Sequence, residues 1–489
     1  MPATRNYLAL DLGASHGRAV LGRLAGGRLE VRRVHDFENT PIAVGGRRCW
    51  DTEALFGEIL TALKLAADMS GSRLDGVAVD SWGLDFCLFD GRRRLLSPPT
   101  SYRDGSDRER REEIVAQLGR LAYYEKTGVQ LSAMHGAPRL AVALERDRGP
   151  ARRAELMLHM AGSLALWLCG RPSAEHSMLG GCGWCEAVSG RLWGGLLDRL
   201  GIPGRLFPET LAAGSVLGEL LPGIREETGL GPVPVLVPAA HDTANLAAAI
   251  PARGGETFAF LSSGTWGLVG LLSERPLLSR KSFEAGVTNF PVPGGGFMNA
   301  AMFTNLWIIQ ECRRCWCSEG RDLSYDRIVE LALQAEPMTA IVDPDDSSFA
   351  APEDMSLAVQ EFCRRTGQPA PEGAGQTARV VFESLARRCR DALARLESVG
   401  GRRAEVLYVA GGGVRNALLN QLIADATGIP VATAPAEATA VGNMMIQAMG
   451  SGEVGSLAAA REIVRHSFVP ARLQPGDPER REQHRGDRV

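Results

Sequence analysis

Two short turns in the sequence have the composition of phosphate-binding turns. The first, Ala14-Ser15-His16-Gly17-Arg18, follows the apolar segment 7–13, and the second, Ser262-Ser263-Gly264-Thr265, follows the apolar segment 258–261. Backbone N–H groups of small residues between two strands can close around a phosphate oxygen. Glycine and serine also favour plain hairpin turns, so each turn alone permits either interpretation. Two such turns, one in each half of the chain, favour a clamp on the phosphates of a nucleotide.

Asp11 ends the first apolar segment, where a carboxylate can support Mg²⁺, usually through water. Only three of the 54 basic residues are lysines, and no glycine precedes any of them. The Gly-Lys-Ser/Thr loop that binds phosphate in many nucleotide enzymes is therefore excluded. A phosphate site in this chain must rely on backbone N–H groups, hydroxyls and a metal ion.

A third cluster, Gly411-Gly412-Gly413, opens a predicted helix and suits a nucleotide that lies against the glycine backbone. Arg415 and Asn416 follow it, so the cluster does not match the GxGxxG spacing. A dinucleotide site of the Rossmann type is disfavoured.

A possible general base and a possible sugar site come from two other segments. In His241-Asp242-Thr243, which follows a predicted strand, Asp242 is placed either as a base or as the cap of the next helix. In the segment 81–86, Gly83 and Asp85 beside a tryptophan suit a polyol, or simply a bend between two strands.

These residues require strands that end beside them. Apolar patterns predict strands over 7–13, 19–24, 29–37, 74–80, 83–90, 232–238, 404–410 and 429–432. Helical spacing predicts helices over 50–69, 106–117, 157–169, 244–250, 416–428 and 437–449. The segment 256–272 repeats the strand-turn-strand pattern of the N-terminus, which indicates a duplicated α/β chain with a boundary near 240–255.

The composition narrows the class of protein. A chain of 489 residues predicts about two to four domains, and its formal net charge of −3 gives no reason to expect a nucleic-acid partner. The N-terminus has no apolar stretch of signal-peptide length before its first acidic residue, and the longest apolar region, 157–170, is too short to span a bilayer, so we expect a cytoplasmic protein with no membrane partner. Two CxxC pairs, Cys182/Cys185 and Cys312/Cys315, lie far apart in the chain, which favours buried free cysteines over a zinc site.

Taken in order, these segments resemble the FGGY carbohydrate kinase family, part of the wider fold group of actin, sugar kinases and heat-shock chaperones. The motifs that carry the resemblance are ALDLGASHGR (9–18), VDSWGLDF (79–86), YRD (102–104), AAHDTA (239–244), FLSSGTW (260–266), LWIIQ (306–310), AGGGVRNALLNQLIADATGIPV (410–431) and EATAVGN (437–443). Each motif is weak alone, but the set, in the family's order over about residues 5–450, is specific.

The resemblance implies an α/β fold of two actin-like (ribonuclease H-like) domains with the active site in a cleft between them. It implies a sugar-binding domain over 1–246, a nucleotide-binding domain over 247–455, and a C-terminal segment and tail over 456–489. The expected ligands are ATP, Mg²⁺ and a small sugar, and the expected assembly is a monomer or homodimer.

The resemblance also assigns roles to single residues. Asp242 is implied to be the catalytic base and Asp11 to support Mg²⁺. The implied sugar contacts are Gly83, His241, Asp242 and Thr243, to which the polyol interpretation adds Asp85. The implied ATP contacts are Ala14, Ser15, His16, Gly17, Arg18, Thr265, Gln310, Gly411, Gly412 and Gly413.

Within the family the motifs are most similar to those of members that phosphorylate L-rhamnulose at its C1 hydroxyl. Two departures leave the sugar open. Met302 stands where those members have an asparagine, with Asn299 and Asn305 as nearby substitutes, and His135-Gly136 replaces Asn-Thr beside the sugar pocket. The alternatives are a kinase for fuculose, xylulose or another ketose, and a non-catalytic sugar or nucleotide sensor.

Overall fold

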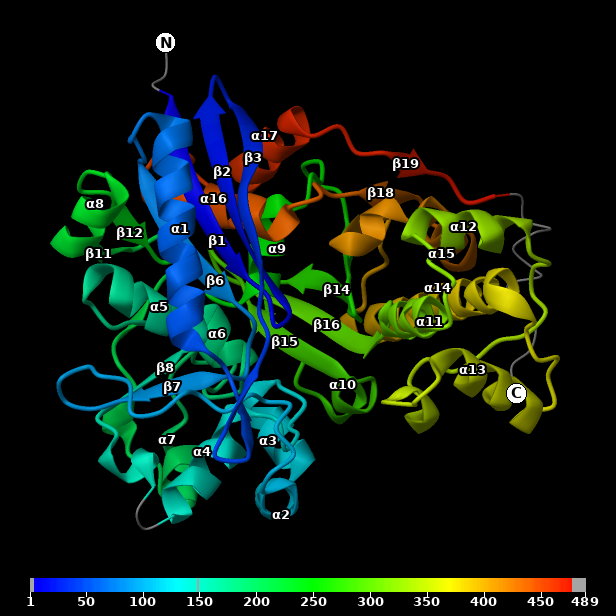
Figure 1. Cartoon of the computed structure of the whole chain (residues 1–489), viewed down its shortest axis with the longest axis horizontal. Coiled ribbons are helices and arrows are strands. Elements are labelled where there is room, and N and C mark those ends of the chain that lie inside the picture. The colour runs from blue at the N-terminus through cyan, green and yellow to red at the C-terminus, as the bar shows by residue number, and fades with distance from the viewer. Residues whose placement is uncertain (1–3, 147–148, 477–489) are drawn as a thin grey trace. The chain divides into compact units, whose positions relative to one another are not determined.

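The computed structural model describes residues 4–146 and 149–476. The chain forms two compact units, each assembled from segments that are separated in the sequence. The first contains Met1–Arg253, Ser273–Asn299 and Ala438–Phe468, and the second contains Gly254–Leu272, Ala300–Glu437 and Val469–Val489. Each unit has a central sheet with helices packed on it, as Figure 1 shows, and each is described by itself.

The first unit is built on a six-stranded sheet of order β11-β12-β6-β1-β2-β3. Strands β12, β6 and β1 are parallel to one another, whereas β11, β2 and β3 pair antiparallel with their neighbours. The bounds are β1 (Arg5–Leu12), β2 (His16–Ala25), β3 (Arg28–Glu38), β6 (Gly76–Ser81), β11 (Val216–Glu219) and β12 (Pro234–Leu236). Shorter strands of this unit are β4 (Ile42–Val44), β5 (Arg47–Cys49), β7 (Phe86–Phe89), β8 (Leu156–His159), β9 (Ala174–Glu175), β10 (Thr210–Leu211) and β15 (Val287–Pro291).

The first unit also contains the following helices. They are α1 (Thr52–Ser70), α2 (Arg108–Leu118), α3 (Arg120–Thr127), α4 (Gly136–Glu145), α5 (Met160–Cys169), α6 (His176–Gly181), α7 (Gly194–Leu200), α8 (Pro222–Thr228), α9 (Leu246–Ala249), α10 (Arg280–Glu284), α16 (Ala438–Gly450) and α17 (Leu457–Ser467). The longest of them, α1, begins where the Asp51 side chain accepts from the N–H of Ala54 at 2.9 Å, and it ends at Gly71, which has a φ of 64°.

The two faces of the first sheet pack on different helices, because successive side chains of a strand point to opposite faces. On β1, Leu8, Leu10 and Leu12 join one core with residues of α1 and α5. On the other face, the Tyr7 hydroxyl hydrogen-bonds Ser451 just after α16, with 2.6 Å between the oxygens. The sheet is thus covered on both sides, and its polar chemistry is confined to the strand ends.

The second unit is built on a seven-stranded sheet of order β15-β16-β14-β13-β17-β18-β19, whose edge strand β15 comes from the segment 273–299. Strands β13, β17 and β18 are parallel, and β14 and β19 pair antiparallel with β13 and β18. The strand bounds are β13 (Phe258–Ser263), β14 (Trp266–Ser273), β16 (Phe297–Thr304), β17 (Val406–Ala410), β18 (Val431–Thr433) and β19 (Arg472–Leu473). The helices are α11 (Trp307–Ser318), α12 (Tyr325–Gln334), α13 (Met355–Arg365), α14 (Gly373–Gly400) and α15 (Ala417–Thr427).

Some predicted elements differ from those observed. The segment 157–169 is not one helix, because Leu156–His159 pairs with β7 as strand β8 and the helix begins at Met160. The predicted strand 83–90 begins only at Phe86, since Leu84 before it has a φ of 77° and turns the chain. The predicted helix 244–250 is a 3₁₀ turn, η3 (Asp242–Asn245), followed by the short helix α9.

The compact units are less continuous than the predicted domains. The segments 273–299 and 438–455, assigned by sequence to the nucleotide-binding domain, pack with the first unit. The reason for the second of these is that α16 packs on β1 and β6. The part of the predicted tail over 477–489 lies outside the described residues. The roles assigned to the two predicted domains stay predictions.

Candidate active site

Three aspartates gather at the carboxyl ends of the parallel strands in the first unit. Asp11 and Asp80 are register partners on β1 and β6, so their side chains lie on the same face of the sheet. Asp242 begins η3, which follows β12. Burial of Asp80, followed by the negative charges of Asp11 and Asp242, raises the pKa of the Asp80 carboxyl well above its ordinary value. Three carboxyl groups therefore gather at this edge of the sheet, and their proximity favours the protonated form of Asp80.

Asp242 remains accessible within this cluster. Its side chain is 29 % exposed. Its Oδ1 accepts from the Thr243 backbone N–H at 2.5 Å and from the Thr243 hydroxyl at 3.1 Å. The residue that caps η3 is His241, which makes no side-chain capping bond. Asp242 therefore bonds the first turn of η3 without being its capping residue, and its role as base stays a prediction.

The structure brings Gly83 and His241 together. A side chain at Gly83 would place its Cβ 2.7 Å from His241 Nε2, so only glycine fits. The His241 ring packs edge-on against Phe290, with 5.1 Å between the ring centroids. Its Nδ1 lies 2.9 Å from Asp242 Oδ1, without the alignment of a hydrogen bond. These contacts fix the imidazole beside the Asp242 carboxylate.

Asp85 differs from the other predicted sugar contacts because it is fully buried. Its Oδ2 accepts from the indole N–H of Trp50 at 2.6 Å and of Trp82 at 2.9 Å. Its Oδ1 accepts from Arg139 at 2.6 Å, in a buried ion pair. Both oxygens are thus engaged, which favours a bracing role for Asp85 under the Ser81–Leu84 segment over direct contact with a sugar.

The first predicted phosphate turn joins β1 to β2 as a tight hairpin. The Gly13 N–H donates to the His16 carbonyl at 2.9 Å, and Asn39 donates to the Gly13 carbonyl from the side at 2.9 Å. A Cβ on Gly17 would lie 2.2 Å from the Phe37 ring, so the chain needs glycine there. Ser15 and His16 are exposed at the tip. The base of the turn is thus held by hydrogen bonds, and its tip is exposed.

The second predicted phosphate turn lies in the other unit, between β13 and β14. The Thr265 hydroxyl donates to Gln310 Oε1 at 3.1 Å, which brings two predicted ATP contacts together. Asn305 donates to the Ser263 hydroxyl at 2.9 Å and to the Gly264 carbonyl at 3.2 Å. Asn305 therefore braces this turn from inside, whereas Asn299 is buried in the first unit and bonds Asn289.

The glycine cluster lies directly beside this turn, because β13 and β17 are parallel and their carboxyl ends coincide. Gly411 has a φ of 80°, and a Cβ on Gly413 would lie 2.0 Å from the Ser263 hydroxyl. Gly412 is exposed, and a Cβ added there would lie no closer than 4.0 Å to the Ser263 carbonyl oxygen. The 3₁₀ turn η5 (Gly412–Arg415) follows before α15 begins. Thr265, Gln310 and Gly411–Gly413 thus form one patch.

Asp80 and Tyr102 lie inside two of the motifs that carry the resemblance, but the sequence analysis assigns a role to neither residue. The pKa of Tyr102 is raised by burial, and the charges of Asp85 and Asp242 add to that rise. The signal was the position of each residue inside a motif, Asp80 in VDSWGLDF and Tyr102 in YRD. The sequence did not reveal that Asp80 lies on the same face of the sheet as Asp11.

The donor set of the first unit fits Mg²⁺. The Asp80 Oδ1 is buried without a hydrogen-bond partner among the described residues, and Asp11 lies beside it. In residues 4–146 and 149–476, no three His, Cys, Asp or Glu side chains form a ready-made metal cage. Mg²⁺ commonly uses one or two carboxylates and takes its other ligands from water and phosphate, so the incomplete cage agrees with this ion.

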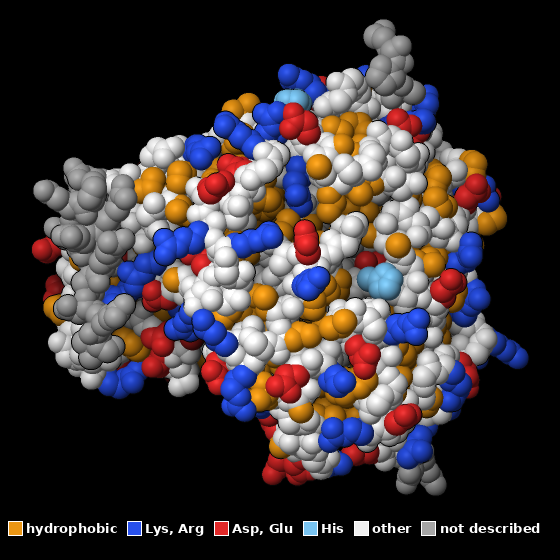
Figure 2. Space-filling view, turned by 180° about the vertical axis from the view of Figure 1, so that it is seen from behind, with side chains coloured by type: hydrophobic (Ala, Val, Ile, Leu, Met, Phe, Trp, Pro, Cys, Tyr) orange, Lys and Arg blue, Asp and Glu red, His pale blue; other side chains and the backbone are white. Residues whose placement is uncertain are grey.

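The surface and the cysteines bear on the other sequence expectations. Figure 2 shows acidic and basic side chains interspersed over one face. Across the part of the chain that the structure describes, no helix is both long and apolar enough to cross a bilayer. Both CxxC pairs are buried as free thiols, and Cys182 accepts from the Leu84 N–H with 3.2 Å between sulfur and nitrogen.

Comparison with known proteins places these features in a family. The model of the FGGY family of carbohydrate kinases, N-terminal domain, matches residues 6–249, and that of the C-terminal domain matches residues 259–451. The chain belongs to the FGGY family of carbohydrate kinases. A rhamnulokinase of Bacteroides thetaiotaomicron is 36 % identical over 97 % of this chain and 96 % of its own length. A rhamnulokinase of Oceanobacillus iheyensis is 32 % identical over 94 % and 96 %.

The fold agrees with this assignment. A crystal structure of gluconate kinase from Lactobacillus acidophilus superposes with a TM-score of 0.80 and covers 99 % of this chain and 96 % of its own, at 14 % identity. The two-domain actin-like fold is thereby established. As an FGGY carbohydrate kinase, the chain is an ATP-dependent sugar phosphotransferase. Its aspartate cluster falls within the N-terminal family domain, and its Thr265 patch within the C-terminal one.

Proposed function

We propose that this carbohydrate kinase transfers the γ-phosphoryl group of ATP to the C1 hydroxyl of L-rhamnulose, with Asp242 as general base. The observation that carries the proposal is an accessible Asp242 carboxylate, held by Thr243 beside His241 and near two further aspartates. The relatives over nearly the whole chain that are named rhamnulokinases support the choice of sugar.

In this mechanism the sugar lies against Gly83, His241 and Thr243, with its primary hydroxyl at Asp242. Asp242 accepts the hydroxyl proton as the oxygen attacks the γ-phosphorus in line with the leaving oxygen of ADP. The transferred group is largely dissociated in such reactions, so positioning and charge stabilisation do most of the work. The glycine at position 83 lets the backbone approach the His241 imidazole closely, so that both can contact the sugar.

ATP is proposed to use the two turns and the glycine patch. Thr265, with its hydroxyl held by Gln310, and the exposed backbone of Gly412 serve the nucleotide, and the tip formed by Ala14 to Arg18 serves its phosphates. Asp11, with Asp80 behind it, would hold Mg²⁺. When bound, this ion neutralises charge on the phosphate oxygens. We also propose that the protein is located in the cytoplasm.

The decisive experiment replaces the base. Asp242→Asn keeps the size and the acceptor oxygen for Thr243 but removes proton acceptance, so kcat is expected to fall by about 10²–10⁴-fold. Binding of the ketose, measured by calorimetry, is expected to persist. The assay couples ADP release to a spectroscopic signal. A variant that keeps the wild-type kcat would show that Asp242 is not the base.

One observation supports a different ketose as an alternative substrate. His135, at the position where the sequence departs from its relatives, is buried, and burial lowers its pKa to about 4. The ring is therefore neutral near pH 7 and accepts at Nδ1 from the Ser132 N–H, at 3.1 Å. If this substitution reshapes the sugar pocket, fuculose or xylulose would give a higher kcat/KM than rhamnulose in the same ADP-release assay.

A further inference from the structure

The regular strand pairing of the backbone that carries Asp242 ends before the site, and an isolated parallel bridge between His241 and Ser81 follows it. Strand β12 ends at Leu236, and Pro238 has no N–H to donate. The N–H groups of Ala240 and His241, the two residues before the proposed base, donate to side chains and not to the backbone of a strand. Buried N–H groups need acceptors, so something outside the sheet must hold this turn.

The acceptors come from a segment more than sixty residues earlier in the chain. Oε2 of Glu175 accepts from the Ala240 N–H at 3.0 Å, and the Ser177 hydroxyl accepts from the His241 N–H at 3.2 Å. Ser177 donates its own hydroxyl proton to the same Oε2, which also accepts from the N–H groups of Ser177 and Met178. Four donors thus converge on one buried carboxylate oxygen.

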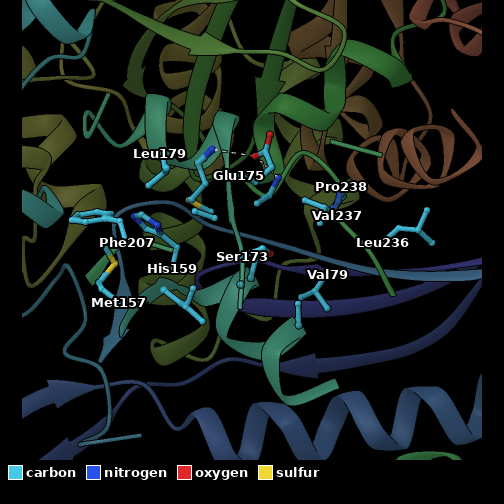
Figure 3. A pocket seen from close by; sticks show the side chains of 17 residues that line it. Val79, Met157, His159, Ser173, Glu175, Leu179, Phe207, Leu236, Val237 and Pro238 are labelled. Atoms are coloured by element: carbon cyan, nitrogen blue, oxygen red, sulfur yellow. Dashed lines mark hydrogen bonds between the residues drawn. The ribbon is translucent and has the colours of Figure 1, made fainter. Parts of the chain in front are cut away.

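Packing alone does not fix the turn. A cavity of ≈ 30 Å³ lies beside it, lined in part by Glu175, Pro238 and Ala240. Figure 3 shows the Glu175 carboxylate at the end of this cavity, with Pro238 and Val237 on one side and His159 on the other. A void deprives its walls of contact atoms, so the position of Ala240 and His241 depends on the hydrogen bonds to Glu175 and Ser177.

The opposite side of the turn is held by different groups. The Asn245 amide donates to the Ala239 carbonyl at 2.9 Å, and the Ser81 N–H donates to the Ala240 carbonyl at 2.9 Å. Carbonyls are therefore anchored toward Ser81 and Asn245, and amides toward Glu175 and Ser177. Each peptide plane is fixed from both ends, which sets the direction in which the next residue, Asp242, leaves the backbone.

We propose that Glu175 is a positioning residue of the phosphoryl-transfer reaction, which acts with Ser177 by holding the Ala240-His241 backbone so that the Asp242 carboxylate faces the sugar hydroxyl. This inference rests on the proposed role of Asp242 as base. Glu175 touches neither reactant in this scheme. A general base displaced by about 1 Å can cost on the order of 10²-fold in rate, so a distant carboxylate can matter as much as a contact.

The test uses three variants and one matched control. Glu175→Ala and Ser177→Ala remove acceptors of the turn and should lower kcat by about 10- to 100-fold, with the KM for ATP unchanged. Glu175→Gln keeps an acceptor oxygen at the same place and should restore most of kcat. Glu219→Gln, an exposed carboxylate on the strand next to β12, should behave as wild type. Circular dichroism and melting curves report whether each variant folds.

A double-mutant cycle separates positioning from general damage. If Glu175 acts through Asp242, then Ser177→Ala or Glu175→Ala should cost little more in an Asp242→Asn background, measured in single turnovers. Folded variants that keep the wild-type kcat, or that lower it equally with and without Asp242, would overturn the inference. An Asp242→Asn protein with full activity would instead overturn the proposed function, so the two failures are distinguishable. Should Glu175→Ala not fold, Ser177→Ala and Glu175→Gln decide the question.

Discussion

Asp80 is a buried carboxyl group in the first unit, and its surroundings disfavour its negative charge. Its Oδ2 accepts from the Asn443 amide at 2.5 Å, while Oδ1 has no partner among the described residues. Burial, and then the charge of Asp11, raises its pKa well above the ordinary value. A carboxyl with a raised pKa in the folded state binds its proton more tightly there than in the unfolded chain. Folding stability therefore falls as the pH rises from about 4 through the folded-state pKa.

This sign gives a prediction for Asp80→Asn. The amide cannot ionise, so the variant escapes the cost of a buried negative charge near neutral pH but gains nothing where Asp80 is already protonated. We expect its melting temperature to exceed that of the wild type by a few degrees at pH 7, with the difference vanishing near pH 4. Differential scanning calorimetry at the two pH values measures it. Equal melting temperatures at both would show that Asp80 carries no such cost.

Asp85 and Arg139 show the other way to bury charge. Their ion pair is almost fully inaccessible, and two indole N–H groups satisfy the remaining carboxylate oxygen. Buried pairs of this kind seldom add net stability, but removing one partner is costly because the other charge is left behind. Here the pair sets the geometry of the turn at Gly83 and Leu84, which is its contribution to the site.

At the scale of elements, α16 is held against the first sheet through glycine. A Cβ on Gly442 would lie 2.0 Å from the Asn245 carbonyl oxygen, and a Cβ on Gly22 of β2 would lie 2.2 Å from Met444. The close approach lets Asn443 reach Asp80 and lets Gln447 donate to the Leu8 carbonyl at 3.0 Å. Helix α16 thus contacts both η3 and Asp80 and supports their positions.

A pair of glycine substitutions tests this arrangement. In Gly442→Ala the added methyl group would clash with the Asn245 carbonyl oxygen and push α16 away from η3. We expect this variant to be destabilised by about 1–3 kcal/mol. Gly57→Ala, in the exposed middle of α1 with no atom within 4 Å of the new Cβ, should stabilise it by about 0.4–1 kcal/mol. Urea titrations measure both. If Gly442→Ala proved as harmless as Gly57→Ala, the helix would not depend on this contact.

At the scale of the whole molecule, ligand binding reports the substrate. A ligand that binds only the folded state stabilises it by about 2.7 kcal/mol at a concentration of 100 Kd. We expect L-rhamnulose, with a non-hydrolysable ATP analogue and Mg²⁺, to raise the melting temperature more than fuculose or xylulose at equal concentration. A thermal-shift panel measures this. A larger shift with another ketose would reassign the sugar while leaving the kinase family intact.

The sequence by itself determined the kinds of chemistry and their order along the chain. The small residues Ala14, Ser15, Gly17 and Gly411–Gly413 allow backbone to approach a phosphate, and the order of the motifs is a property of the sequence alone. For the same reason local pattern predicted α1, α16 and β17, whose apolar spacing and caps are contained in their own segments.

Only the tertiary structure decided which of these residues meet. The strand β8 formed inside a predicted helix because β7 offered it hydrogen bonds. Asp85 became a buried brace because two tryptophans and Arg139 converge on it from separate elements. Three of the four donors to Glu175 are local, from Ser177 and Met178 at the start of α6, but its link to the site is not, since the Ala240 N–H reaches it only when α6 and the turn after Pro238 are brought together. Such contacts depend on long-range packing, which no local pattern of residues specifies.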